Sequence, residues 1–486
     1  MAEFDIWQDR FSALANAITQ FEGSLQSGTR TAEEQQEAAN MVNLVKCLGE
    51  FAEKQFHFFY DGFVTQAEYI LNPSREFPPE YVFSATLNQI AEDLEVLRRI
   101  ADQRLAAETR AQLRQADQLA WSALRPAVES NMILDANTTV MTYFQKGASI
   151  RVIPYASVAL VAIPFTAPSV SQDFLALPHE VGHYVYRHAK GERGKSIPQT
   201  LGSKLMALAE PSVKWARRWK EEVFADVYGC LIGGPVTALS FRDLALRSSR
   251  TPIIQVPGEY LYGEFSEDDG VHPVPLVRPY VYVKTLAEVG LKELAAQLDK
   301  DWKERPPVQE TRDFRSRYTS VGVDYVSVEE AREEVAKIVD EVLDLLPDLR
   351  LNASFRWSGR SDRETMADLY GNFKTNITAL MGQNNAPSLK PLLDDELAYL
   401  WQNWVKQENF FPGMTDVPPG KNITAIDSGK ADRLEQLEQE PRYTWNHVFL
   451  AGGWATKLPG ASGSGVVFPK NWQGVNQASG GGGSGY

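Results

Sequence analysis

The chain has 486 residues, of which 43% are hydrophobic, so it is long enough to form more than one hydrophobic core. Its 63 acidic residues outnumber its 49 basic residues, which gives a formal net charge of −14. This balance argues against nucleic acid as a partner, because nucleic-acid-binding proteins normally present a basic face to the phosphates.

Cysteine content and the N-terminal segment bear on the cellular compartment of the protein. Only Cys47 and Cys230 are present, which excludes a disulfide framework and leaves one bridge open. The start MAEFDIWQDR lacks the basic residues and apolar core of a secretory signal. There is no run of about 18 apolar residues, so we expect no membrane span. These features predict a cytoplasmic protein.

Residues 1–130 are predicted to be helical. A T-A-E-E string at Thr31 fits a capping box with Glu34, so a helix is expected to begin there. A longer helix follows, and charged residues in DLEVLRRIADQRLAAETRAQLRQ fill the gaps in its apolar face. A bundle packed on the rest of the protein is favoured over a coiled-coil arm, and it could also recruit a protein partner. The first predicted helix has an apolar face formed by Phe4, Trp7, Phe11, Leu14, Ile18, Phe21 and Leu25. The apolar face of the longer helix is formed by Leu87, Ile90, Leu94, Leu97 and Ala101.

Strands are predicted after Asn137, where β-branched and aromatic residues are interrupted by Gly147, Pro154 and Pro164. The run SVALVAIP, residues 157–164, is nearly all apolar and is typical of a strand covered on both faces.

The string HEVGH follows on a predicted helix. His179 and His183 are four residues apart and share one helix face, so both imidazoles can bind one Zn²⁺. Glu180 is turned by about 100° around the helix from His179, and from there it can reach a metal-bound water as a general base. Pro178 places the helix start near residues 176–178, and Gly182 keeps the helix slim beside the site.

A third ligand is expected from KEEVFADVYG, within a helix predicted over residues 211–231. Glu222 can reach the metal, and Asp226 can hold the far nitrogen of a ligand histidine. Glu221 is a poorer alternative ligand, since it is five residues from Asp226. The other interpretation treats these carboxylates as ordinary surface charges. Three of the six histidines occur in LALPHEVGHYVYRH, which favours a site, although His188 lies off the ligand face and is expected to be a bystander.

The remainder of the chain is predicted to begin with a loop over residues 252–279. The helix SVEEAREEVAKIVDEVLDLL follows, with Ser327 and Glu330 as a capping box and Pro347 as its stop. The expected division is a helical region at 1–130, a core at 131–290, a mostly helical region at 291–450, and a Gly/Ser-rich tail at 451–486.

The combination of HEVGH with EEVFAD resembles the gluzincin zinc metallopeptidases, the thermolysin-like group with HExxH and a downstream ExxxD. Over residues 138–278 the resemblance implies an α+β, zincin-like core. It assigns zinc binding to His179, His183 and Glu222, the general base to Glu180 and the outer contact to Asp226.

The resemblance also implies a donor for the oxyanion of the reaction. His272, with Arg278 nearby, is the candidate; Tyr260 and Tyr262 compete with it, and an ordinary loop histidine is the alternative. Such enzymes commonly pair an edge strand with the substrate backbone, for which SVALVAIP is the candidate.

These observations predict a zinc-dependent endopeptidase acting on a protein or peptide substrate. The alternative is a non-catalytic regulatory or scaffold protein that retains a metallopeptidase fold.

Overall fold

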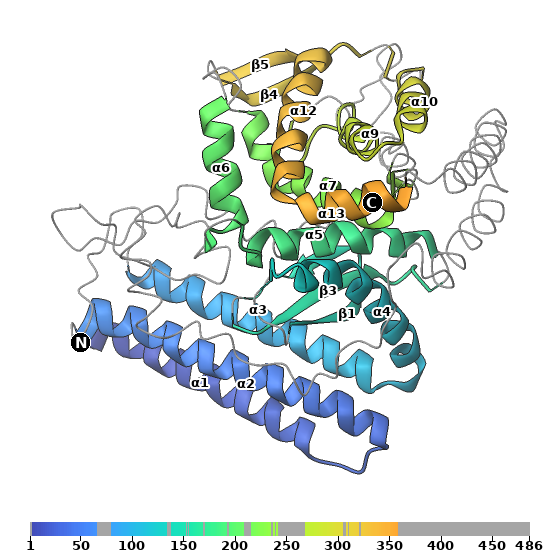
Figure 1. The fold of residues 1–486 in the computed structure, drawn as a ribbon. Helices are drawn as coiled ribbons and strands as arrows, with labels where there is room; N and C mark the ends of the chain where they lie inside the picture. Colours follow the sequence, from blue (N-terminus) through green and yellow to red (C-terminus); the bar gives the residue numbers. More distant parts are fainter. Residues whose placement is uncertain are drawn as a thin grey trace, which may run out of the picture.

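The protein belongs to the α+β class: in the described part of the chain helices dominate, accompanied by one three-stranded sheet and one two-stranded hairpin (Figure 1). The computed structural model describes residues 2–65, 79–133, 138–241 and 268–357, with short gaps inside the last two ranges. The Gly/Ser-rich tail, the region beyond residue 357, Tyr260 and Tyr262 lie outside the described residues. No described helix is long and apolar enough to cross a membrane.

The first helices form a bundle and not an isolated arm. They are α1 (Ala2–Gln26), α2 (Ala32–Tyr60) and α3 (Pro79–Leu105), and a short π-helix (Asp61–Thr65) extends α2. The apolar stripes predicted for α1 and α3 face a shared core. The capping box at the start of α2 is confirmed, because the Glu34 backbone N–H donates to Thr31 Oγ1 at 3.2 Å and the Thr31 N–H donates to Glu34 Oε2 at 3.0 Å.

The long charged helix predicted after α2 is divided in two. Helix α3 ends at Leu105, Ala106 is extended with φ −76° and ψ 126°, and α4 (Ala107–Glu129) begins next. Arg110 donates to the carbonyls of Arg104 and Leu105 at 3.0 and 2.9 Å, which satisfies acceptors at the end of α3. The apolar pattern of residues 87–101 does not predict this break, for which the hydrogen bonds of Arg110 compensate.

The sheet has the strand order β1-β3-β2. Strand β3 (Val158–Pro164) pairs in parallel with β1 (Thr139–Gln145) and antiparallel with β2 (Ser149–Arg151). The prediction that SVALVAIP is covered on both faces is confirmed, because its residues from Val158 to Ile163 are buried. Its assignment as an edge strand is wrong, since β3 lies in the centre.

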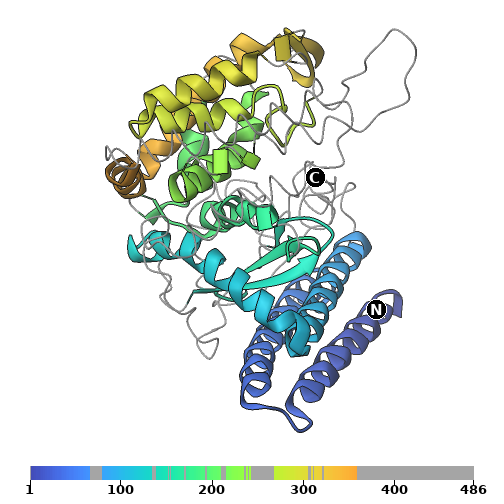
Figure 2. The ribbon, with the colours of Figure 1, turned by 90° about the vertical axis from the view of Figure 1, so that its right-hand side faces the viewer.

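The two faces of β3 contribute to two different cores. Val158, Leu160 and Ala162 join the core of α1, α2 and α3, whereas Ala159 and Val161 join a core that includes α4 and α5 (Leu177–His188). Figures 1 and 2 accordingly show the bundle and the C-terminal helices at opposite ends, with the sheet and α5 between them. The N-terminal helices therefore support the sheet from the side opposite α5.

The second half of the described chain surrounds α7 (Lys220–Gly233). Helix α7 follows a 3₁₀ turn (Ala216–Trp219); the predicted helix start at residue 211 lies outside the described residues. Ser327 caps α12 (Val328–Leu345) as predicted, since its Oγ accepts from the Glu330 N–H at 3.1 Å. Helix α12 ends at Leu345, and Pro347 begins α13 (Pro347–Trp357). The other described elements are a 3₁₀ turn at Ser171–Ala176, α6 (Ile197–Leu208), α9 (Pro279–Glu288), α10 (Lys292–Lys303), β4 (Asp313–Thr319) and β5 (Gly322–Ser327).

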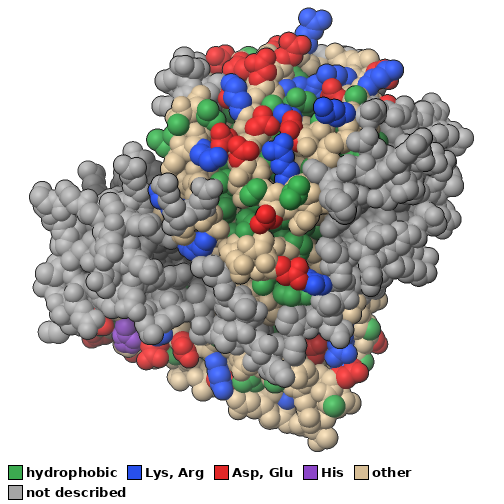
Figure 3. Space-filling model, viewed as in Figure 1, with side chains coloured by type: hydrophobic (Ala, Val, Ile, Leu, Met, Phe, Trp, Pro, Cys, Tyr) green, Lys and Arg blue, Asp and Glu red, His purple; other side chains and the backbone are tan. Residues whose placement is uncertain are grey.

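The two cysteines do not form a bridge, because Cys47 and Cys230 are both free and buried. On the face shown in Figure 3, acidic and basic side chains of the described residues are interspersed over the upper part of the molecule.

Candidate metal centre

Two glycines allow α5 and α7 to approach closely. A Cβ atom at Gly182 of α5 would come within 2.8 Å of the Ala225 Cα. On α7, a Cβ atom at Gly229 would come within 3.2 Å of the His179 backbone nitrogen. Real Cβ atoms are not found at the first of these distances, so the crossing requires glycine at position 182. Pro178 occupies the first turn of α5, as its position in the sequence predicted.

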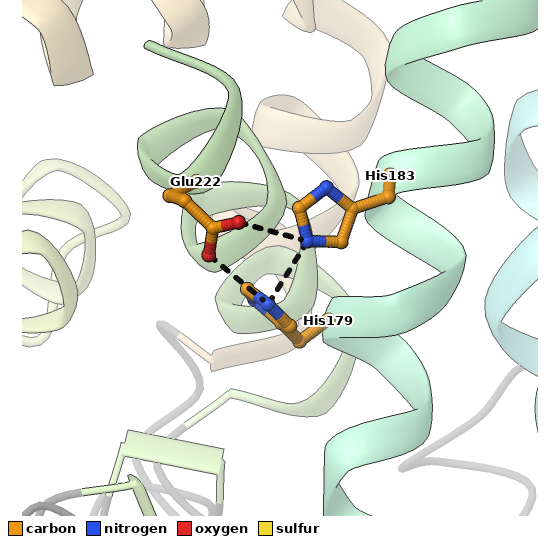
Figure 4. A group of neighbouring side chains, drawn as sticks. All are labelled: His179, His183 and Glu222. Carbon is orange, nitrogen blue, oxygen red and sulfur yellow. Dashed lines mark hydrogen bonds and ion pairs between the residues drawn. The ribbon is translucent and has the colours of Figure 1, made fainter. Parts of the chain in front are cut away.

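The close crossing brings three potential metal ligands together (Figure 4). Nε2 of His179 lies 3.2 Å from Nε2 of His183. Glu222 faces both rings, with Oε1 3.4 Å from the His183 nitrogen and Oε2 3.6 Å from the His179 nitrogen. Ligands about 2.0–2.1 Å from a tetrahedral zinc lie roughly 3.3–3.4 Å from one another. The donor set thus fits zinc in both chemistry and spacing.

Carboxylates face the opposite nitrogen of each imidazole. Nδ1 of His179 lies 2.9 Å from Asp226 Oδ1, and Nδ1 of His183 lies 3.4 Å from Glu221 Oε1. A carboxylate at Nδ1 favours the tautomer that carries its proton there, which leaves Nε2 as a lone-pair donor. Two such lone pairs 3.2 Å apart repel each other unless a cation or a proton lies between them.

Glu221 supports the site without belonging to the group of three donors. Its carboxylate accepts from both Nε and Nη2 of Arg187, with the Nε contact at 2.8 Å. Burial alone would raise the pKa of Glu221, but the charges and hydrogen bonds of Arg187 and His183 hold it at about 2. Arg187 was not identified from the sequence, although it is four residues after His183 and therefore on the same helix face.

Asp226 is fully buried and is held by two further side chains. Arg278 donates from Nε to Oδ2 at 2.8 Å and from Nη2 to Oδ1 at 3.0 Å, and the Tyr282 hydroxyl donates to Oδ1 at 2.9 Å. Burial would raise the pKa of Asp226, but Arg278 and His179 outweigh it and lower the pKa. Tyr282 was also missed from the sequence, because no local pattern connects α9 with α7.

Glu180 lies between the two candidate ligand histidines along α5 and is buried, with 8% of its surface exposed. Burial is the largest influence on its carboxyl group and raises its pKa, although the neighbouring His179 and His183 act in the opposite direction. A carboxylate with a raised pKa is a stronger base than one in water, which suits it to accept a proton.

His272 lies at the rim of the group. Its Nε2 is 3.5 Å from Glu222 Oε1, and its Nδ1 is 2.7 Å from Asp269 Oδ2. The side chain is 40% exposed, so this ring lies partly in solvent beside the three candidate ligands. Burial would lower its pKa, but Glu222 and Asp269 outweigh that effect and raise it, which favours a ring that can donate from Nε2.

His188, at the end of α5, stacks on Tyr184 with ring centroids 4.2 Å apart. It does not belong to the group of three donors found among the described residues. This placement agrees with its predicted role as a bystander.

Comparison with known proteins adds no further information on this site. No protein-family model matches the chain, and neither a curated protein nor a solved structure is significantly similar to it.

Proposed function

We propose that the protein is a zinc-dependent peptidase of gluzincin type with a zincin-like core. The observation that carries the proposal is the convergence of His179, His183 and Glu222. Their donor atoms are 3.2 to 3.6 Å apart, and a carboxylate faces the far nitrogen of each imidazole. Three protein ligands also leave a fourth position for water, which distinguishes catalytic zinc sites from structural ones.

Glu180 and His272 would carry out the proton transfer and the oxyanion stabilisation of the reaction. When bound, zinc would lower the pKa of a coordinated water and polarise the scissile carbonyl group. Glu180 takes the proton of the attacking water and passes it to the leaving amine, for which its raised pKa is suited. His272 donates from Nε2 to the oxyanion that develops on the carbonyl oxygen.

The substrate is a peptide that adds a strand beside β2. Strand β2 occupies an edge of the sheet and packs against α5, which carries the two histidines. Its backbone groups on the side away from β3 do not pair with any other described strand. An extended peptide there would be held by main-chain hydrogen bonds. The edge-strand role thus moves from SVALVAIP to residues 149–151.

Metal analysis and a cleavage assay test the proposal together. Purified full-length protein is expected to contain one zinc per chain and to cleave an unfolded protein substrate. A chelator should abolish the cleavage, and added zinc should restore it. Protein that carries no zinc after exposure to it, or that cleaves equally well after chelation, would contradict the proposal.

One observation favours the second candidate, a scaffold protein that retains the fold without catalysis. Arg278 donates to both Glu222 and Asp226, so part of the site's negative charge is balanced without a metal. In the same experiment, one bound zinc without cleavage of any substrate tested would support this candidate.

A further inference from the structure

Arg278 places a permanent positive charge inside the metal site. Its side chain is 4% exposed, and in addition to its two hydrogen bonds with Asp226 it donates from Nη2 to Glu222 Oε2 at 3.0 Å. The guanidinium carbon also lies 4.6 Å from the ring centroid of Phe241. Hydrogen bonds on one side and an aromatic ring nearby hold the group firmly.

The same guanidinium group reaches one of the metal donors. Nη2 of Arg278 is 3.4 Å from Nε2 of His179, the nitrogen that faces His183 and Glu222. Two carboxylates, Glu222 and Asp226, are buried at this point with 8% and 0% of their side chains exposed. Two buried carboxylates without a cation would strongly destabilise the fold.

We propose that Arg278 is an internal counter-cation that keeps the metal ligands in place when no metal is bound. The inference depends on the metal site of the proposed function and concerns its metal-free form. Many small metal-binding domains unfold on metal removal, because metal binding supplies their folding free energy. Here Arg278 partners both carboxylates. On zinc entry the 3.4 Å contact with His179 gives way, while the hydrogen bonds to Asp226 can remain.

The thermal stability of the full chain with and without zinc tests this inference. In the wild type, chelation is expected to lower the Tm only slightly. In Arg278→Met, the buried carboxylates lose their permanent cation, so zinc balances a larger part of their charge. The Tm gain on adding zinc should therefore exceed the wild-type gain by about 3–10 °C. Arg278→Lys retains one charge without the bidentate geometry and should show a smaller excess.

Arg332→Met is the matched control. Arg332 also pairs with an aspartate, Asp299, and also lies over an aromatic ring, with its guanidinium carbon 4.4 Å from the Tyr280 centroid. Its loss should lower the Tm equally with and without zinc. If the wild type binds zinc and both Arg278 variants show the wild-type gain, the counter-cation role is wrong and the metal site stands. If the wild type binds no zinc, the proposed function itself fails. Should Arg278→Met not fold even with zinc, Arg278→Lys alone decides the matter.

Discussion

Gly182 of α5 faces Ala225 of α7 so closely that a Cβ atom on the glycine would lie 2.8 Å from the Ala225 Cα. This contact sets the separation of the two helices that carry the ligands. Gly182→Ala must therefore push α5 and α7 apart, although alanine is the better helix former by about 1 kcal/mol. Overpacking of this kind typically costs about 1–3 kcal/mol, and we also expect weaker zinc binding because the donors separate.

Gly23→Ala provides the control for that substitution. Gly23 is also inside a helix, α1, but a Cβ atom there would meet nothing within 4 Å. This variant should be stabilised by about 0.5–1 kcal/mol and bind zinc normally. Denaturant unfolding and zinc titration compare the two, and equal behaviour of both variants would show that the helix crossing does not depend on Gly182.

Glu180→Gln separates metal binding from catalysis. The amide has almost the same shape as the carboxylate but cannot accept a proton at neutral pH, so cleavage should fall by at least about 10²–10⁴-fold. Zinc content should remain one per chain, because Glu180 does not belong to the three-donor group. Initial cleavage rates and metal analysis give the two values, with the exposed Glu304→Gln as control. Full activity of Glu180→Gln would show that another group accepts the proton.

Glu221→Gln tests whether Glu221, which is held by Arg187, orients the His183 ring. The substitution removes the charge that pairs with Arg187 and weakens the contact with His183 Nδ1. Loss of such an outer contact typically reduces metal affinity about 10–100-fold. A competition titration with a coloured zinc chelator measures the change. Unaltered affinity would mean that His183 is oriented by packing alone.

Zinc affinity should increase with pH between about 7 and 9. Burial would lower the pKa of His183, but the charge of Glu222 and the contact with Glu221 raise it to about 9 in the metal-free site. Zinc needs the neutral ring, so it must displace a proton below this pKa and bind more weakly as pH falls. One displaced proton corresponds to a tenfold loss of affinity per pH unit. Titrations across this range, combined with proton release measured in two buffers, check the slope; a flat profile would contradict it.

Arg104 anchors the helical bundle to the sheet. With 3% of its side chain exposed, it pairs with Glu37 of α2 and Asp117 of α4 at 3.3 and 2.7 Å and donates to the Thr142 carbonyl of β1 at 2.8 Å. Arg104→Met leaves two buried carboxylates without this partner, which should cost about 3–5 kcal/mol of unfolding free energy.

Arg99→Met is the matched substitution for Arg104. Arg99 is also on α3 but pairs with Glu95 at the surface, where 38% of its side chain is exposed, so its loss should cost at most about 1 kcal/mol. Urea unfolding of both variants gives the comparison. A similar cost for both would show that the buried cluster does not secure the bundle.

The features predicted from the sequence are those that depend on neighbours three or four residues away. The stripe on α1, the caps at Thr31 and Ser327 and the shared face of His179 and His183 all follow from helical periodicity. The spacing of Glu222 and Asp226 within α7 is of the same kind. The sequence KEEVFADVYG and the gluzincin resemblance both predict Glu222 as a partner of the two histidines, and the three donors lie together where α5 crosses α7.

Strand order and contacts between distant elements were decided only by the tertiary structure. An all-apolar run shows that β3 is covered on both faces, but it cannot show which strands pair with its edges. Arg278, 52 residues after Asp226, and Tyr282 contact that carboxylate because α9 packs on α7, a consequence of long-range packing. Local sequence thus determined which side chains share a helix face, whereas packing of the helices determined which charges meet around the proposed metal.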